Sequence, residues 1–268
     1  MRIAGIRVVA AAAIFLALHA IFGRERIRGR GDLARLAGLS VLGVSANQGL
    51  FVLGLARTTA LNAQLIITSV PALTVAAALF LGRESASPGK LAGVAVAASG
   101  ALYLVGVERF QPGASLGDAL IFGNSACYAF YLVLGRDLLA KYRPLTVATW
   151  VFVFGAGPLV LLALASGGAA LVVPSNKVLV VLAFVVLGPS VGSYLLNAWA
   201  LVRARSSLVA IYVYGQPLVT TALMGFLLHE RPSVRSLPSA LLIFGGVAMV
   251  AWAERGGAPR SGAPTKPI

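Results

Sequence analysis

The sequence predicts an all-α fold, a polytopic membrane helical bundle of about nine transmembrane helices arranged as two inverted-topology repeats of four and five spans. Three observations predict it. Hydrophobic residues make up 59% of the chain and charged residues only 11%, whereas about 25% of the residues in a soluble domain are charged. The mean hydropathy is +0.90. The apolar residues form runs long enough to cross a bilayer, and one such run recurs later in the chain.

A helix needs about 20 mostly apolar residues to cross a hydrocarbon layer of about 30 Å. The first segment that meets this criterion contains Arg7 close to its start. Connectors rich in Gly and Pro, such as Ser87-Pro88-Gly89, separate the later segments. We expect nine spans, at about Ile3 to Phe22, Leu36 to Ala56, Leu61 to Leu81, Leu91 to Val107, Leu116 to Gly135, Leu145 to Ala165, Val178 to Val202, Leu208 to Leu228 and Leu237 to Ala253.

Lys and Arg residues in the short loops indicate the orientation, because they collect on the cytoplasmic side of a membrane. With the C-terminus inside, fifteen of the 22 basic residues lie on the cytoplasmic side and seven lie outside. We therefore expect a multi-pass protein of the bacterial inner (plasma) membrane with a cytoplasmic C-terminus. The net charge of +14 comes from these flanking residues rather than from one basic face, so nucleic acid is not an expected partner.

One segment of the chain recurs at a fixed offset. TSVPALTVAAALFLGRE, from Thr68 to Glu84, aligns without a gap on YGQPLVTTALMGFLLHE, from Tyr214 to Glu230, and Pro71 meets Pro217, 146 residues later. Apolar helices also resemble each other by composition alone, but Pro and Glu residues that match at a single offset favour a true repeat. Five spans separate the two copies, and because this number is odd, the copies cross the membrane in opposite senses.

Inverted repeats are an architecture of many secondary transporters, whose substrate site lies near the bilayer midplane between the repeats. We predict a truncated first repeat of four spans at residues 1–107 and a second repeat of five spans at residues 108–254. The remaining residues, 255–268, are rich in Gly and Pro and predict a disordered cytoplasmic tail.

The Ala- and Leu-rich helices, the paired Pro71 and Pro217, and the runs LGRE (Leu81 to Glu84) and LLHE (Leu227 to Glu230) resemble the EamA-type drug/metabolite transporter family. The resemblance implies ten helices in two five-helix inverted repeats, both termini in the cytoplasm, and export of amino acids or other metabolites. The segment Met1 to Phe22 resembles the second helix of the family, so this chain differs by one helix. Either the start codon has been assigned too late or the first helix is absent.

Polar residues within the spans are the candidates for a substrate cavity, because such side chains face the interior of a membrane bundle or a water-filled space. Spacings of three and four residues place Asn124, Tyr128 and Tyr131 on one helix face. The alternative for any one of these residues is hydrogen bonding between helices. The expected cavity residues are Asn47, Gln48, Asn62, Gln64, Thr68, Asn124, Tyr128, Tyr131, Ser193, Tyr194, Asn197, Tyr212, Tyr214 and Gln216.

Two further pairs of residues occupy equivalent places in the repeat. Pro71 and Pro217 each remove a backbone hydrogen bond and favour a kink, which we interpret either as a hinge or as a static bend. Glu84 and Glu230 fall at the ends of spans beside basic residues, where ion pairing or capping outside the hydrocarbon is the expected role.

The sequence lacks the residues of most alternative functions. All eight acidic residues lie in loops or at span ends, so no midplane carboxylate is available for a proton relay. The chain has a single cysteine, Cys127, and no HExxH motif, so we expect no catalytic residues, no metal and no cofactor. We also found no basic residue in the middle of a span, which disfavours phosphate esters as substrates.

The function that these observations predict is export of a small neutral or zwitterionic, amino-acid-like metabolite by alternating access. The expected partners are the lipid bilayer and a small-molecule substrate, and association into a homodimer stays open. The alternative is a membrane scaffold, or a degenerate truncated paralogue, that transports nothing.

Overall fold

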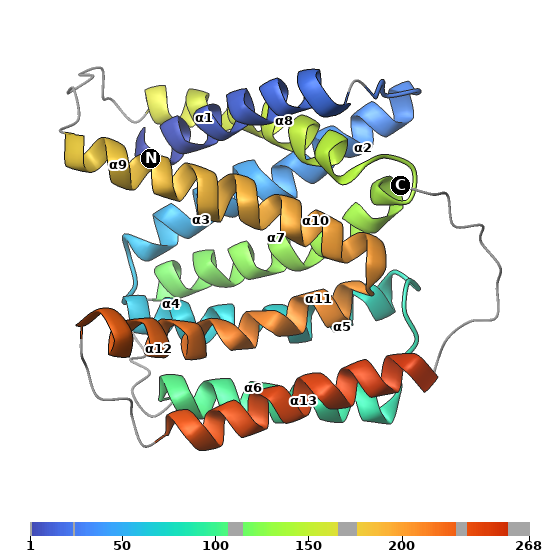
Figure 1. The fold of residues 1–268 in the computed structure, drawn as a ribbon, viewed down its shortest axis with the longest axis vertical. Helices are drawn as coiled ribbons and strands as arrows, with labels where there is room; N and C mark the ends of the chain where they lie inside the picture. Colours follow the sequence, from blue (N-terminus) through green and yellow to red (C-terminus); the bar gives the residue numbers. More distant parts are fainter. Residues whose placement is uncertain (1, 24, 107–114, 166–175, 229–234, 257–268) are drawn as a thin grey trace.

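A computed structural model describes residues 2–23, 25–106, 115–165, 176–228 and 235–256, and the statements below concern these residues. Every regular element among them is a helix (Figure 1), which confirms the predicted all-α class. Eight segments of the described chain are long and apolar enough to cross a membrane. Glu230 and residues 257–268 of the predicted tail lie outside the described residues.

The helices follow one another with short breaks, and several spans are made of two or three consecutive elements. In chain order they are α1 (Arg2–Leu18), η1 (His19–Gly23), α2 (Arg30–Ser40), η2 (Val41–Ser45), α3 (Ala46–Leu55), α4 (Ala60–Ile67), α5 (Val70–Phe80), α6 (Pro88–Val105), α7 (Ser115–Leu139), α8 (Pro144–Ala165), α9 (Asn176–Val185), η4 (Val186–Gly192), α10 (Ser193–Arg203), α11 (Ser206–Ile211), η5 (Tyr212–Gly215), α12 (Gln216–Leu228) and α13 (Ser236–Gly256). The expected span from Leu208 to Leu228 is interrupted by the 3-10 turn of η5, so it is not one continuous helix.

Local sequence explains where two of these helices begin. The Thr59 hydroxyl accepts a hydrogen bond from the Asn62 backbone N–H at 3.1 Å and caps α4. The Ser87 hydroxyl accepts one from the Lys90 backbone N–H at 3.3 Å and caps α6, and Pro88 follows it in the first turn. Such caps satisfy backbone donors that have no partner within the helix, and Pro fits the first turn because it has no N–H to satisfy.

Helix starts recur at the offset that the sequence repeat has. The starts of α2 and α9, of α4 and α11, and of α5 and α12 are each 146 residues apart. The π-helical segments η2 and η4 also occupy corresponding places, each in the middle of a long span. The division into domains at residues 107 and 108 stays a prediction.

Helix α7 lies at the centre of the bundle, where it contacts α2, α3, α4, α5, α10 and α11. In Figure 1, α1, α2 and α8 form the upper edge of the molecule, and α6 and α13 pack side by side at the lower edge. α1 packs against α8, just as α6 packs against α13, and the members of each pair are about 146 residues apart. The candidate site lies between these two edges.

Glycines allow α6 and α13 to approach closely. A Cβ added at Gly246 would lie 2.5 Å from both the Ala97 backbone nitrogen and the Gly93 carbonyl oxygen. Membrane helices commonly pack through such small residues, because backbones then approach within van der Waals contact. The neighbouring Gly245, in contrast, has open space where its Cβ would be.

The outer surface of the bundle is strongly apolar, as expected of helices that face lipid. Phe80, Phe226 and Trp252 have 85%, 80% and 78% of their surface exposed. Large aromatic side chains that point outwards would be unfavourable in water, but hydrocarbon solvates them. This surface supports the predicted contact with a lipid bilayer.

We expect Gly246→Ala to lower the thermal stability of the purified protein, because its Cβ would meet backbone atoms that cannot move aside. Overpacking of this kind costs about 1–3 kcal/mol. The matched variant Gly245→Ala should leave stability unchanged or raise it slightly, since Ala is the better helix former. Thermal unfolding in detergent, followed by size-exclusion chromatography, compares the two variants, and equal effects would contradict the close packing of α6 on α13.

Candidate functional site

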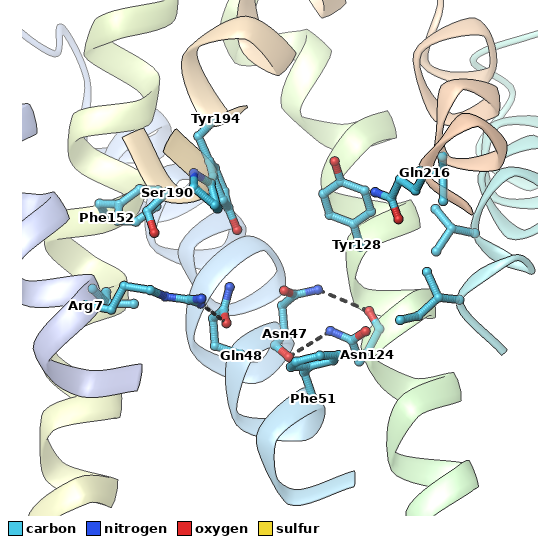
Figure 2. Close-up of a pocket in the computed structure, with 15 residues that line it drawn as sticks. Arg7, Asn47, Gln48, Phe51, Asn124, Tyr128, Phe152, Ser190, Tyr194 and Gln216 are labelled. Atoms are coloured by element: carbon cyan, nitrogen blue, oxygen red, sulfur yellow. Dashed lines mark hydrogen bonds between the residues drawn. The ribbon is translucent and has the colours of Figure 1, made fainter. Parts of the chain in front are cut away.

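A cavity of about 390 Å³ lies in the middle of the bundle (Figure 2). This volume falls within the range of small-molecule sites, about 300–1,000 Å³. Three of its lining residues, Asn47, Tyr128 and Tyr194, lie well inside spans rather than at their ends. The described residues that line the cavity are Arg7, Val8, Asn47, Gln48, Phe51, Ile67, Val70, Asn124, Tyr128, Phe152, Pro189, Ser190, Tyr194, Val213 and Gln216.

A π-helical segment in α9–η4–α10 brings Ser190 to the cavity. Pro189 has no N–H, so it cannot bond the carbonyl of Val185 four residues earlier, and it distorts the helix there. The Ser190 hydroxyl donates to that carbonyl at 3.1 Å instead. The sequence analysis did not identify Pro189 as a break, although a proline in the middle of a span was a visible signal for one.

The second π-helical segment, η2, receives a hydrogen bond from across the cavity. The Tyr194 hydroxyl donates to the Gly43 carbonyl oxygen at 2.6 Å. Gly43 has no side chain, and a Cβ there would lie 2.5 Å from the Tyr131 ring, so the glycine lets the ring pack against this turn. The hydrogen bond therefore ties α10 to the irregular part of the α2–η2–α3 span.

Two asparagines join α3 to α7 beneath the cavity (Figure 2). The Asn47 side-chain amide donates to the Asn124 backbone carbonyl oxygen at 3.2 Å, and the Asn124 side-chain amide donates to the Asn47 backbone carbonyl oxygen at 2.8 Å. Both side chains are buried. This reciprocal pair uses one N–H of each side-chain amide, so the two asparagines hold the helices together as well as lining the cavity.

Arg7 is the one charged side chain among the described lining residues. Its Nη2 donates to the Gln48 side-chain oxygen, and Gln48 and Tyr194 both line the cavity with it. The Arg7 Nε is buried and has no partner within the described chain. Arg7 was not among the predicted cavity residues. The apolar residues on both sides of Arg7 were the signal that its side chain turns into the bundle.

Six of the fourteen predicted cavity residues line this cavity, and eight do not. Hydropathy alone did not predict the direction in which the side chains of these eight residues point. Those that line it are Asn47, Gln48, Asn124, Tyr128, Tyr194 and Gln216, and those that do not are Asn62, Gln64, Thr68, Tyr131, Ser193, Asn197, Tyr212 and Tyr214.

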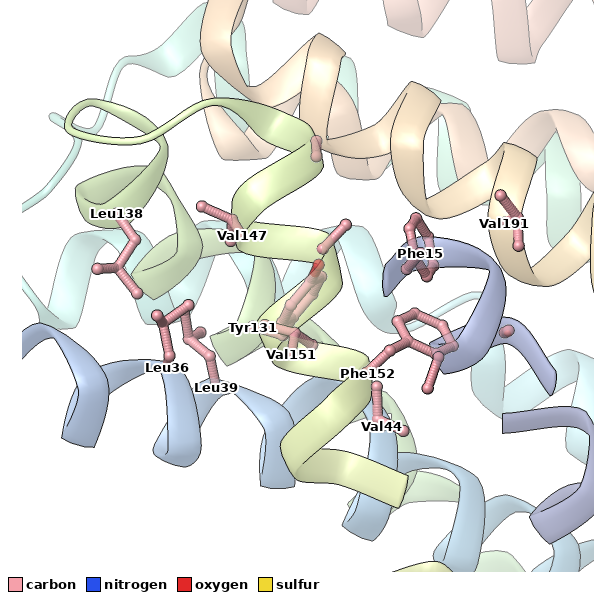
Figure 3. Close-up of a cluster of buried hydrophobic side chains, with 14 of the residues drawn as sticks. Phe15, Leu36, Leu39, Val44, Tyr131, Leu138, Val147, Val151, Phe152 and Val191 are labelled. Atoms are coloured by element: carbon pink, nitrogen blue, oxygen red, sulfur yellow. The ribbon is translucent and has the colours of Figure 1, made fainter. Parts of the chain in front are cut away.

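The residues that lie away from the cavity have other partners or other surroundings. Tyr131 belongs to an apolar cluster with Phe15 and Val151 (Figure 3). Tyr214 is fully buried among apolar side chains, whereas 64% of the surface of Tyr212 is exposed. Ser193 is also exposed. These four residues therefore serve packing or face outwards.

The other four are the polar residues of α4 and α10. Asn62 is completely buried in the first turn of α4, and Thr68 donates its hydroxyl to the Leu65 carbonyl of the preceding turn. Gln64 is partly buried. Asn197 donates to the Tyr128 hydroxyl and so supports a cavity residue from behind.

The two repeat prolines begin helices rather than kinking them. Pro71 lies in the first turn of α5, after a break in the helix at Thr68 and Ser69. Pro217 is the second residue of α12, after the 3-10 turn of η5. In both places the missing proline N–H costs nothing, because the first turn of a helix has no internal partners for it. The expected kink is therefore a discontinuity between two helical segments.

A buried ion pair closes the bundle at the end away from Arg7. The Glu84 carboxylate accepts hydrogen bonds from Lys90 Nζ, from the Ser207 hydroxyl, from the Ser206 hydroxyl at 2.6 Å and from the Ser207 backbone N–H at 3.3 Å. Glu254, at the end of α13, lies 4.0 Å from Lys90. The predicted ion pairing at Glu84 is present, but it is buried and joins α5 and α6 to α11.

The charge of Glu84 is stabilised by its partners. Burial raises the pKa of the carboxyl, but hydrogen bonds from Lys90, Ser206 and Ser207 outweigh that effect and lower the pKa to about 2 from its ordinary 4.5. Glu84 lies just outside the segments that qualify as membrane spans. Its carboxylate therefore stays ionised at any physiological pH.

A bundle of interrupted membrane helices around a central polar cavity is the architecture of a solute transporter, in which irregular backbone lines the substrate path. Comparison with known proteins gives the same class. The chain belongs to the EamA-like transporter family, which matches residues 1–106 and 115–252. The resemblance noted in the sequence is therefore confirmed, and the chain is a transporter rather than an enzyme.

Several relatives carry transporter names. The chain is 31% identical to an uncharacterized transporter of Archaeoglobus fulgidus over 215 residues, 79% of this chain and 74% of that protein. It is 28% identical to an uncharacterized transporter of Bacillus subtilis over 160 residues, 58% of this chain and 52% of that protein. A solved crystal structure matches with a TM-score of 0.79 at 19% identity, over 94% of this chain and 88% of that one, so the fold is shared.

We expect Glu84→Gln to lower the free energy of unfolding by about 3 kcal/mol at pH 7, because the buried Lys90 loses its hydrogen-bonded carboxylate and keeps only Glu254, at 4.0 Å. The folded-state pKa of Glu84 is depressed to about 2 from 4.5, so its contribution is present above pH 4.5 and is lost as the pH falls towards 2. The difference between wild type and E84Q should shrink over that window. Unfolding in SDS or heat at several pH values measures it.

Two matched variants test the cause of this loss. Replacing both partners, in Glu84→Gln with Lys90→Met, should recover much of the stability, since the buried ammonium is removed together with its hydrogen-bonded carboxylate. Asp137→Asn breaks the exposed pair with Arg83, whose oxygen and nitrogen lie 2.6 Å apart, and should cost less than about 1 kcal/mol. A D137N effect as large as that of E84Q would contradict the importance of burial.

Proposed function

We propose that the protein exports a small, amino-acid-like metabolite across the bacterial inner membrane by alternating access. The observation that carries this proposal is the central cavity, whose lining combines residues of the first predicted repeat, such as Gln48, with residues of the second, such as Tyr194 and Gln216. A site between two inverted repeats is exposed to one side of the membrane at a time when the repeats rock against each other. The proposed repeats are residues 1–107 and 108–254, followed by a cytoplasmic tail at 255–268.

The two ends of the bundle differ in a way that supports alternating access. The ends of α5 and α10 and the start of α11 lie together at the right of Figure 1, and there the Glu84 network joins both predicted repeats. With the orientation that the basic residues favour, this closed end is cytoplasmic. Gln216 lines the cavity and is exposed, so the cavity is accessible. We propose that this arrangement is an outward-facing state.

The breaks before Pro71 and Pro217 are the proposed hinges. Each lies between two short helical segments near the middle of a span, and Val70, beside Pro71, lines the cavity. A discontinuity with few helical hydrogen bonds allows the segments to change angle at little energetic cost.

We expect the purified protein in proteoliposomes to exchange labelled amino acids or related small metabolites across the membrane. Gln216→Leu should lower that transport severalfold while leaving thermal stability unchanged, because the exposed Gln216 amide lines the cavity and its loss costs no buried partner. Gln64→Leu is the matched control, since Gln64 does not line the cavity. Counterflow of a panel of labelled solutes measures both variants. Failure of the wild type to move any solute in the panel would favour the non-transporting scaffold instead.

A further inference from the structure

The charges in the cavity are unbalanced, and this imbalance indicates what the cavity binds. Its described lining residues include one guanidinium, that of Arg7, together with amides and hydroxyls, but no carboxylate. We propose that Arg7, positioned by Gln48, binds a carboxylate group of the transported solute. This inference rests on the proposed transport function and narrows it, because a neutral solute without a carboxylate would leave the charge of Arg7 uncompensated.

The hydrogen bonds of Arg7 leave room for an anion. A guanidinium has five N–H donors in a planar fork. Among the described residues, Arg7 donates from Nη2 to the neutral Gln48 oxygen, and its buried Nε has no partner. The ion pairs in the described chain involve Arg83, Lys90 and Lys141, and none involves Arg7. A charged group with free donors in a low-dielectric cavity is costly, and a bound anion offsets that cost.

The surroundings of Arg7 fix its side chain in place. Gln48 accepts from Nη2, and this bond joins α1 to α3. Tyr194 of α10 lines the same cavity and is held by the bond from its hydroxyl to the Gly43 carbonyl at 2.6 Å. A positioned guanidinium loses little conformational entropy when it binds a carboxylate through two parallel hydrogen bonds.

The size of the charge and the rest of the lining favour a monocarboxylate over a phosphate ester. One guanidinium balances one negative charge, whereas a phosphate dianion would leave a net charge in the cavity. Phe51, Ile67 and Val70 supply an apolar wall for the body of the solute. In Figure 2, Tyr128 and Gln216 lie on the other side of the cavity from Arg7, where they can bond a second polar group of the solute.

The test compares carboxylates with their amides. Each solute in a panel of amino acids and simple monocarboxylates is paired with its amide, which has the same shape and no negative charge. Millimolar concentrations of each are added to purified protein, and the shift in unfolding temperature is measured, with counterflow in proteoliposomes in parallel. The wild type should be stabilised by at least one carboxylate and not by its amide. Arg7→Gln should weaken binding of that carboxylate about tenfold or more, which is the loss of a charged hydrogen bond.

The controls separate loss of recognition from loss of fold. Arg7→Lys keeps the charge without the fork and should retain part of the preference. Arg57→Gln removes an exposed arginine that follows the end of α3 and donates to the Leu53 carbonyl of that helix, so it should keep the full preference. Arg7→Met provides a second variant should Arg7→Gln fail to fold.

The outcomes distinguish the two proposals. A carboxylate preference that R7Q abolishes and R57Q retains supports the inference. Equal binding of acid and amide by the wild type, an unchanged preference in R7Q or R7M, or no stabilisation by any carboxylate overturns it. Transport of solutes regardless of their carboxylate would overturn the role of Arg7 while leaving the transporter proposal intact. Carboxylate binding without transport would support the role of Arg7 and overturn the transporter proposal.

Discussion

Every polar group that this chain carries into the bilayer needs a partner inside the bundle, because hydrocarbon offers none. In the two π-helical segments around the cavity, η2 and η4, side-chain hydroxyls supply these partners. Where Pro189 leaves the Val185 carbonyl without its usual donor, the Ser190 hydroxyl replaces it at 3.1 Å. The Gly43 carbonyl, in the other π-helical segment, receives the Tyr194 hydroxyl. The same interactions that repair the helices therefore also turn polar side chains towards the centre of the molecule.

The sequence predicted the class of fold, the positions of most spans and the offset of the repeat, because bilayer thickness and hydrophobicity determine these features with little influence from tertiary contacts. It did not predict the breaks within spans. Leu208 to Leu228 is as apolar as an uninterrupted helix, yet η5 divides it. This division depends on the packing around Tyr214, which is completely buried among apolar side chains. Hydropathy does not predict that packing.

The cavity was only partly predictable for a related reason. A polar residue within a span is expected to face inwards, but the inward direction contains both the cavity and the contacts between helices. Asn124 and Asn197 illustrate the difference, since the first lines the cavity and the second bonds Tyr128 from behind. Arg7 was not predicted to line the cavity, because it lies near the start of a span, where basic residues commonly face the membrane surface. Which of these directions a side chain takes depends on neighbouring helices that are distant in sequence.

The two copies of the repeat have corresponding helices, but some corresponding positions carry side chains with different hydrogen-bonding groups. This difference affects alternating access. Gln48 and Tyr194 are 146 residues apart, and both line the cavity. In contrast, the position 146 residues before Ser206, which bonds Glu84, is Ala60, whose side chain has no hydrogen-bonding group. An equivalent serine bond therefore cannot form from that position. If the two repeats exchange conformations, opening the Glu84 end breaks the Ser206 hydrogen bond, which Ala60 cannot replace. The energy for that step has to come from the bound solute or from a coupled ion, since a ligand shifts a conformational equilibrium only by its difference in affinity for the two states.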